Sequence, residues 1–143
     1  MKSRDEPCTS YKLNVLIVDD NPHFLKAARS LIGALSCVAG TECVNSGAEA
    51  LAHVGRLRSD LAPDLVLTDI SMPEMSGFEL IRKLRALVGR PRVLAVSLHE
   101  SPEYRAAVLR SGAEGLISKR EFGAVAPKLI AAMASGSKEG AHG

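Results

Sequence analysis

Residues 63–77 read PDLVLTDISMPEMSG, and this stretch decides the fold of the chain. The run Leu65–Leu67 is short, apolar and rich in branched side chains, which is typical of a strand buried on both faces of a parallel sheet. Asp69 stands where the run ends, and Met72–Pro73 then interrupts the strand. Ligands of open parallel sheets collect beyond the carboxyl ends of the strands. The pattern therefore places the Asp69 carboxylate at a candidate active crevice.

The rest of the chain alternates strand patterns with helix patterns. Four more apolar runs predict strands, and helix start signals stand between them. Five strand–helix units in alternation predict an α/β domain, with a parallel sheet covered by helices on both faces. The further predicted strands are Leu13–Val18, Val38–Val44, Arg92–Ser97 and Gly115–Lys119, and helix start signals lie at Asn21–Pro22, Ser46–Glu49, Ser76 and Ser101–Pro102.

Local residues refine this prediction. Gly40–Glu42 suit a sheet edge better than its centre. The helix that starts at Ser46 is expected to end near Asp60, and Gly112 should end the helix that starts at Ser101. Pro127 falls within the apolar pattern of the last helix, where it removes a hydrogen bond unless it lies in the first turn.

Length and composition indicate one globular domain over residues 11–134, with a flexible tail at 1–10 and a disordered tail at 135–143. The hydrophobic content of 46%, the charged content of 24% and the absence of an apolar run of membrane-spanning length predict a cytoplasmic protein with no membrane contact. A net charge of +2 is too small to indicate direct binding of nucleic acid. Three cysteines without metal-ligand spacing, Cys8, Cys37 and Cys43, predict no disulfide framework.

Polar residues end four of the predicted strands. Asp19 and Asp20 follow the first strand, Asp69 the third, Ser97 the fourth, and Lys119 closes the fifth. Each alone is more often a cap, a loop residue or a solvated strand end. Together, three carboxylates would raise one another's pKa unless a cation were present, and Mg²⁺ or Mn²⁺ bound by oxygens resolves that repulsion. Carboxylates, an ammonium and a hydroxyl suit phosphoryl transfer, in which an aspartate can be the nucleophile.

These segments resemble one family. The runs VLIVDD (15–20), DLVLTDISMP (64–73) and GLISK (115–119), with Ser97 between the last two, resemble the receiver domain of bacterial two-component response regulators. Residues 97–104 and 111–115 are most similar to the NarL/FixJ class. The resemblance implies a flavodoxin-like, three-layer α/β/α fold with five helices and a five-stranded parallel sheet in the order 2-1-3-4-5.

The resemblance also implies roles for the strand-end residues. Asp69 would be the phosphoacceptor, and Lys119 and Ser97 would contact the phosphoryl group. Asp20, Asp69 and the backbone carbonyl of Ser71 would bind the metal, with Asp19 acting through water. The phosphate donor would be a sensor histidine kinase or a histidine phosphotransfer protein, and the domain would catalyse only its own phosphorylation and dephosphorylation. The output partner, or a second copy, would bind the helix after Ser101, the strand 115–119 and the last helix.

The sequence departs from the family pattern near its signalling residues. Leu116 stands where the family often has Tyr or Phe, and Arg120 stands where many receivers have proline. We therefore expect the signal to leave through Ser97 and the loop that follows it, toward Tyr104. Ser71 and His99 lie two residues after Asp69 and Ser97, where they would flank the attacking water and tune the lifetime of the acyl phosphate.

Three functions stay open at this point. The leading one is a phosphorelay receiver that switches conformation to control a partner. The second is the isolated receiver of a helix-turn-helix transcription factor, whose DNA-binding part this chain does not contain. The third is a Mg²⁺-dependent phosphohydrolase with an aspartyl nucleophile, which would usually carry a second carboxylate where Ser71 stands.

Overall fold

The computed structural model describes residues 12–56, 62–87 and 91–135. Their centre is a five-stranded parallel sheet, and its strand order β2-β1-β3-β4-β5 is the predicted one. β2 is an edge strand, as its glycine and polar residues indicated. The strands are β1 (Leu13–Val18), β2 (Val38–Val44), β3 (Leu65–Asp69), β4 (Arg92–Ser97) and β5 (Gly115–Ser118).

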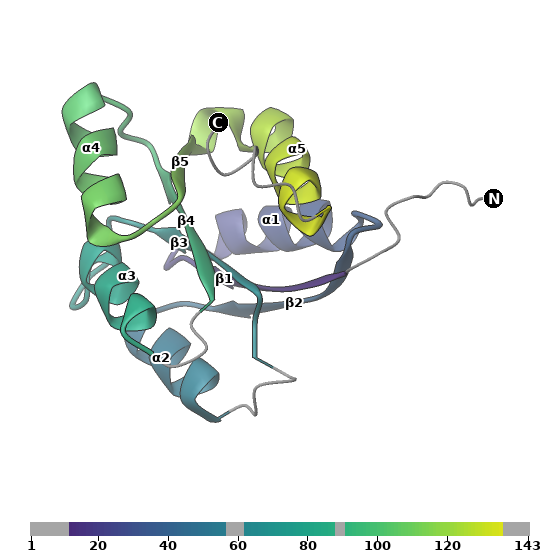
Figure 1. Cartoon of the computed structure of the whole chain (residues 1–143), viewed down its shortest axis with the longest axis horizontal. Coiled ribbons are helices and arrows are strands. Elements are labelled where there is room, and N and C mark those ends of the chain that lie inside the picture. The colour runs from purple at the N-terminus through teal and green to yellow at the C-terminus, as the bar shows by residue number, and fades with distance from the viewer. Residues whose placement is uncertain (1–11, 57–61, 88–90, 136–143) are drawn as a thin grey trace.

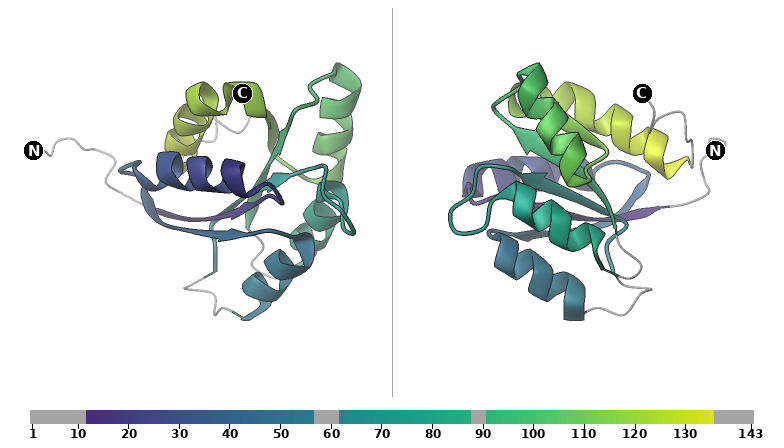
Figure 2. Two further views of the ribbon diagram at one scale, coloured as in Figure 1. Left: turned by 180° about the vertical axis from the view of Figure 1, so that it is seen from behind. Right: turned by 60° about the vertical axis from the view of Figure 1, so that its left-hand side comes forward.

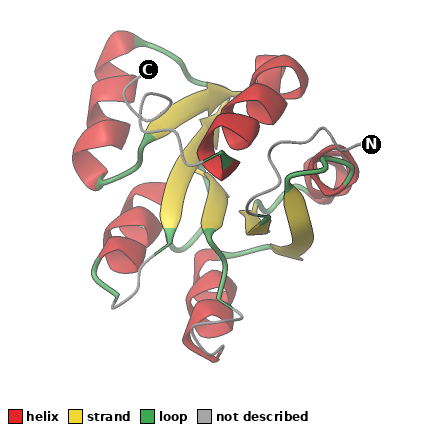
Figure 3. Cartoon of the chain, turned by 45° about the vertical axis from the view of Figure 1, so that its right-hand side comes forward, coloured by secondary structure: helices red, strands yellow, loops and turns green. Residues whose placement is uncertain are grey.

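Helices cover both faces of the sheet, which gives the predicted three layers (Figures 1 and 3). α1 and α5 lie on one face, and α2, α3 and α4 lie on the other (Figure 2). A short 3₁₀ helix, Lys119–Glu121, joins β5 to α5. The α-helices are α1 (Pro22–Gly33), α2 (Gly47–Arg56), α3 (Gly77–Arg85), α4 (Pro102–Ser111) and α5 (Phe122–Ala134). No helix within the described ranges is long and apolar enough to cross a bilayer.

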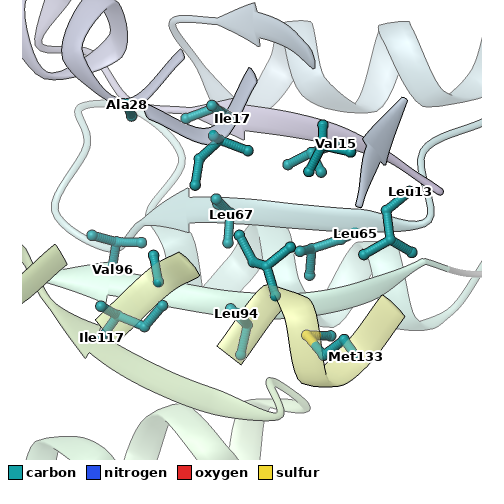
Figure 4. Close-up of a cluster of buried hydrophobic side chains, with 14 of the residues drawn as sticks. Leu13, Val15, Ile17, Ala28, Leu65, Leu67, Leu94, Val96, Ile117 and Met133 are labelled. Atoms are coloured by element: carbon teal, nitrogen blue, oxygen red, sulfur yellow. The ribbon is translucent and has the colours of Figure 1, made fainter. Parts of the chain in front are cut away.

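Two apolar cores hold the layers together, because successive side chains of a strand point to opposite faces. Val15 and Ile17 of β1 pack toward α1 and α5, whereas Leu16 and Val18 pack toward α2 and α3. All five residues of β3 are buried, as the apolar run predicted. Figure 4 shows the first core, in which side chains of β1, β3, β4 and β5 meet the helical layer that contains Ala28 and Met133.

The helix start signals form real caps. The Asn21 side chain accepts hydrogen bonds from the amides of His23 and Phe24, and Ser76 and Ser101 cap α3 and α4. At α2 the Ser46 hydroxyl accepts from the Glu49 amide, but the Glu49 carboxylate binds the Asn45 amide, one residue before the cap. The capping box is therefore only half formed in its usual geometry. Gly112 ends α4 at φ 116°, a conformation that favours glycine.

Several sequence expectations need correction. Pro127 lies beyond the first turn of α5, where it removes a hydrogen bond. The apolar pattern of the last helix also includes Val125, but the Val125 side chain is exposed. Lys119 begins the 3₁₀ helix instead of ending β5. As small apolar residues, Cys37 and Cys43 are expected in the core, but they are only partly buried and pack against its margin. The expected end of α2 near Asp60, Cys8 and the two predicted tails, apart from Ser135, fall outside the described residues.

Candidate functional site

The carboxyl edge of the sheet gathers the predicted strand-end residues. β1, β3, β4 and β5 are consecutive neighbours, and their parallel registers align the ends. Val18 pairs with Thr68, so Asp19 and Asp69 leave adjacent strands at the same level. Ser97 pairs with Ser118, one residue before Lys119. The topology thus assembles side chains that lie far apart in the sequence.

Three carboxylates form the centre of this edge. Asp19, Asp20 and Asp69 each offer one carboxylate oxygen, and these oxygens all lie within 4.8 Å of one another. The side chains of Asp19 and Asp69 are buried, whereas Asp20 is exposed. One Asp19 oxygen accepts a hydrogen bond of 2.9 Å from the Asn21 amide, at the start of α1. The helix cap therefore fixes the orientation of the Asp19 carboxylate.

Lys119 supplies the positive charge of the site. Its Nζ lies 2.8 Å from Asp19 Oδ2 and 3.4 Å from Asp69 Oδ1. Burial lowers the pKa of Lys119, but the close contact with Asp19 and the charges of Asp69 and Asp19 outweigh this effect and hold it above its usual value. The contact with Asp19 Oδ2 is an ion pair whose geometry falls short of a directional hydrogen bond. Among the described residues, that buried oxygen has no hydrogen-bond donor aligned with it.

The surroundings of the Asp69 carboxyl disfavour its charged form. Its pKa rises from the ordinary 3.8 to about 6, first because the group is buried and next because Asp19 carries a like charge; Lys119 opposes these effects. A single ammonium therefore does not compensate two buried carboxylates fully. A buried carboxylate oxygen without an aligned donor, inside a set of three oxygen ligands, fits a hard divalent cation such as Mg²⁺.

The raised pKa of Asp69 predicts a pH-dependent stability. A carboxyl whose pKa is higher in the folded state favours folding at low pH, and this contribution disappears as the pH rises through the folded pKa. Between the ordinary pKa of 3.8 and the folded pKa of about 6, we expect the free energy of unfolding of the wild type to fall by about 3 kcal/mol relative to Asp69→Asn, at about 1.36 kcal/mol per pH unit. Urea denaturation of both proteins in a chelating buffer measures this difference. If the difference in unfolding free energy between the two proteins does not change with pH, the raised pKa of Asp69 is contradicted.

The predicted signalling residues occupy a neighbouring region. Ser97 is buried, and its hydroxyl accepts a 2.9 Å hydrogen bond from the His99 amide, so the start of the β4–α4 loop folds back onto it. The His99 ring lies 5.3 Å from the Tyr104 ring, which contacts Phe78 edge-on at 5.6 Å. Leu116 is buried, and its carbonyl accepts from Arg105 at 3.3 Å. Ser71 is exposed, directly after Ile70.

Two contacts at the site were missed by the sequence interpretation. The Phe24 ring, which helical spacing alone places on the apolar face of α1, has its centre 4.7 Å from Lys119 Nζ. Gly77, at the start of α3, packs against the backbone of Asp69 and Ile70. Both positions could have been found from the sequence. Phe24 comes four residues after Asp20, about one helical turn, and is therefore expected near the acidic residues. Gly77 directly follows the Ser76 cap, where the helix starts close to the end of the strand.

Comparison with known families shows the family to which the chain belongs. The family model of the response regulator receiver domain matches residues 15–131. The chain belongs to this family. The receiver domain is a signalling domain rather than a conventional enzyme, and its matched range includes every residue assigned to the site above.

Curated relatives and solved structures agree with the receiver assignment. The chain is 34% identical over 119 residues to the nitrate/nitrite response regulator NarL of Escherichia coli, covering 82% of this chain and 50% of NarL. It is 38% identical over 107 residues to a transcriptional regulator of Pseudomonas aeruginosa, covering 75% and 49%. The signal receiver domain of a NarL response regulator from Mycobacterium tuberculosis matches with a TM-score of 0.74 at 29% identity, covering 88% and 98%.

These matches identify a receiver of the NarL/FixJ type with the flavodoxin-like fold. The chain spans about half the length of the two curated relatives. The comparison therefore describes one domain, and the activity of those longer proteins does not transfer with it.

Proposed function

We propose that this receiver accepts a phosphoryl group on Asp69 from a phosphohistidine of a sensor kinase or a phosphotransfer protein, and changes conformation to control a partner in a phosphorelay. The observation that carries the proposal is the buried Asp69 carboxylate between two further carboxylates and the Lys119 ammonium. A carboxylate in such a site is a nucleophile, and the surrounding charges set the energy of the transferred group.

The reaction is a substitution at phosphorus. An Asp69 carboxylate oxygen attacks the phosphorus atom, the P–N bond to the donor histidine breaks, and the P–O bond of an acyl phosphate forms. The electron pair of the broken bond stays on the imidazole. Because the pKa of Asp69 is about 6, the carboxylate is largely ionised near neutral pH and available for attack.

Other residues of the site would bind and orient the group. Lys119 already lies 3.4 Å from Asp69 and would bind a phosphoryl oxygen. Ser97 would donate its hydroxyl proton to a phosphoryl oxygen while its oxygen still accepts from the His99 amide. Asp19, Asp20, Asp69 and the Ser71 carbonyl would hold Mg²⁺ or Mn²⁺, which neutralises the charge of the carboxylates and the phosphoryl oxygens. Ser71 and His99 would tune hydrolysis of the acyl phosphate.

Incubation with acetyl phosphate and Mg²⁺ tests the proposal. Intact-mass measurement should show the addition of one phosphoryl group, and borohydride trapping with peptide mapping should locate it at Asp69. Chelation of the divalent cation should prevent the addition. Modification at another residue, or the same extent of modification without a divalent cation, would overturn the assignment.

A second candidate concerns the longer protein. The curated relatives include transcriptional regulators about twice as long as the region that matches. In this second proposal the chain is the receiver of such a regulator, and phosphorylation acts on a DNA-binding part. Sequencing the gene beyond the present chain decides this point.

The route of the signal makes a testable prediction. Leu116 is buried and lacks the polar group of a tyrosine, so two packings of its side chain should differ little in energy. Movement of Ser97 would instead pull on His99 and, through the ring contact, on Tyr104 of α4. We expect a beryllofluoride mimic to change amide exchange at residues 98–110 more than at Leu116.

A pair of variants tests this route. Ser97→Ala should lose most of the response to beryllofluoride, measured as partner binding or dimerisation through the α4–β5–α5 face, whereas Leu116→Ala should retain it. Leu98 and Leu109 are exposed apolar side chains on or next to α4, as a binding face requires. Loss of the response in Leu116→Ala with a full response in Ser97→Ala would reverse the assignment.

A further inference from the structure

Phe24 and Lys119 form a contact that the phosphoryl-transfer chemistry does not use. Phe24 lies in the first turn of α1, partly buried, and Lys119 Nζ stands 4.7 Å from the centre of its ring. This distance is within the range at which the negative face of an aromatic ring attracts an ammonium. The same nitrogen contacts Asp19 and Asp69. The ammonium is therefore held between carboxylates and an aromatic face.

The ring is itself fixed by a second aromatic residue. Phe122, buried and three residues after Lys119, meets Phe24 edge-on with the ring centres 5.1 Å apart and the planes at 72°. Edge-to-face pairs of this kind have a defined orientation. Phe24 thus connects the segment that carries Asp19 and Asp20 with the segment that carries Lys119.

Lysine needs such a constraint more than arginine does. Its ammonium is a point charge on a flexible four-carbon stem, and exposed orientations compete with the one that faces the site. The contacts of Lys119 with Asp19 and Asp69 hold it by charge alone, and protonation of Asp69 weakens this attraction while phosphorylation moves the negative charge to the phosphoryl oxygens. An aromatic face keeps its attraction for the ammonium in all of these states.

We propose that Phe24 is a positioning residue for Lys119, which keeps the ammonium aimed at the reacting carboxylate throughout the phosphorylation cycle. The expected effect on the phosphorylation rate rests on the proposed function of Asp69 and Lys119. The geometric part concerns the resting protein and can be measured without phosphate or metal.

The geometric test uses nuclear magnetic resonance on the metal-free protein. The ring current of Phe24 should shift the ε-methylene protons of Lys119 upfield. Phe24→Leu keeps an apolar side chain but removes the ring, so the shift should disappear; Phe24→Tyr keeps the ring face and should retain it. Leu25→Ala alters the same helix and the same core but removes no aromatic ring, so the shift should stay. Unshifted protons in the wild type, or an unchanged shift in Phe24→Leu, would overturn the proposal.

The kinetic test uses acetyl phosphate with Mg²⁺. We expect Phe24→Leu to form the acyl phosphate about fivefold more slowly, and Phe24→Tyr to stay within about twofold of the wild type. Leu25→Ala should lose stability but keep its rate. In a Lys119→Met background, Phe24→Leu should have no further effect on the rate.

The two tests separate the inference from the function on which it rests. A slower Phe24→Leu that Phe24→Tyr does not rescue, or an equal slowing in the Lys119→Met background, would show that the ring only fills the core. If the wild type is not phosphorylated at all, the proposed function fails, while the resonance test still decides whether Phe24 positions the lysine.

Discussion

Replacing Asp69 with asparagine should reduce acyl phosphate formation by at least about a hundredfold, because an amide oxygen is a poor nucleophile at phosphorus. The substitution keeps the size and shape of a side chain that lies buried between Asp19 and Lys119. It also removes one of two buried like charges, so the folded protein should become more stable at neutral pH. Loss of reactivity would then accompany a gain in stability, which separates a chemical defect from an unfolded protein.

Two measurements check this result. Phosphoryl incorporation is followed by intact mass, and stability is followed by urea denaturation at about pH 7. Glu42→Gln is the matched control, because it removes an exposed carboxylate on the edge strand β2 and should leave both quantities unchanged. If Asp69→Asn incorporates phosphate as fully as the wild type at a single site, another residue is the acceptor.

Replacing Gly77 with alanine should have the second largest effect, this time on the fold beneath the site. A methyl group at Gly77 would meet the carbonyl oxygen of Asp69 and lie 2.6 Å from the Cα of Ile70. These are backbone atoms that cannot rotate away, and the Gly77 amide also donates a 2.8 Å hydrogen bond to the Ile70 carbonyl. We expect destabilisation by about 3 kcal/mol, the upper range for added bulk in a packed interior. The helix α3 would move away from the end of β3.

A second glycine provides the control. Gly123 lies exposed in α5, and an added methyl group there meets no atom of the described residues within 4 Å. Gly123→Ala should therefore stabilise the protein by about 0.5–1 kcal/mol through a lower entropy of the unfolded chain. Thermal or urea unfolding of the two variants compares them directly. An unaltered stability in Gly77→Ala would mean that the contact with Asp69 relaxes at little cost.

The order of elements along the chain and the meeting of the strand-end residues were predictable because each depends on local or topological rules. An apolar run such as Leu65–Leu67 indicates a buried strand, and a cap such as Asn21 indicates a helix start. Once the strands are parallel and adjacent, residues at their carboxyl ends must meet. The cluster of Asp19, Asp20 and Asp69 follows from that reasoning, whereas the confirmed strand order was implied by the family resemblance.

What the sequence could not predict depends on distances between segments that are remote in the chain. The lysine contact of Phe24 requires the rotation of α1 relative to the 3₁₀ helix, and apolar spacing alone assigns Phe24 to the core. The exposure of Val125 depends on the rotation of α5, whose apolar residues nearly surround the helix. The pKa of Asp69 depends on how far one ammonium compensates two buried carboxylates, a matter of ångströms.

The position of Lys119 has a consequence for partial unfolding. Lys119 directly follows β5, a strand of four residues that pairs with β4 at the edge of the described sheet. Edge elements with few neighbours open at a lower free energy than the centre of a sheet. Detachment of β5 would carry the lysine away from Asp19 and Asp69 while β1 and β3 stay paired. The proposed phosphorylation of Asp69 should therefore be lost when β5 detaches from the edge of the sheet. This should happen at temperatures where most backbone amides are still protected from hydrogen exchange.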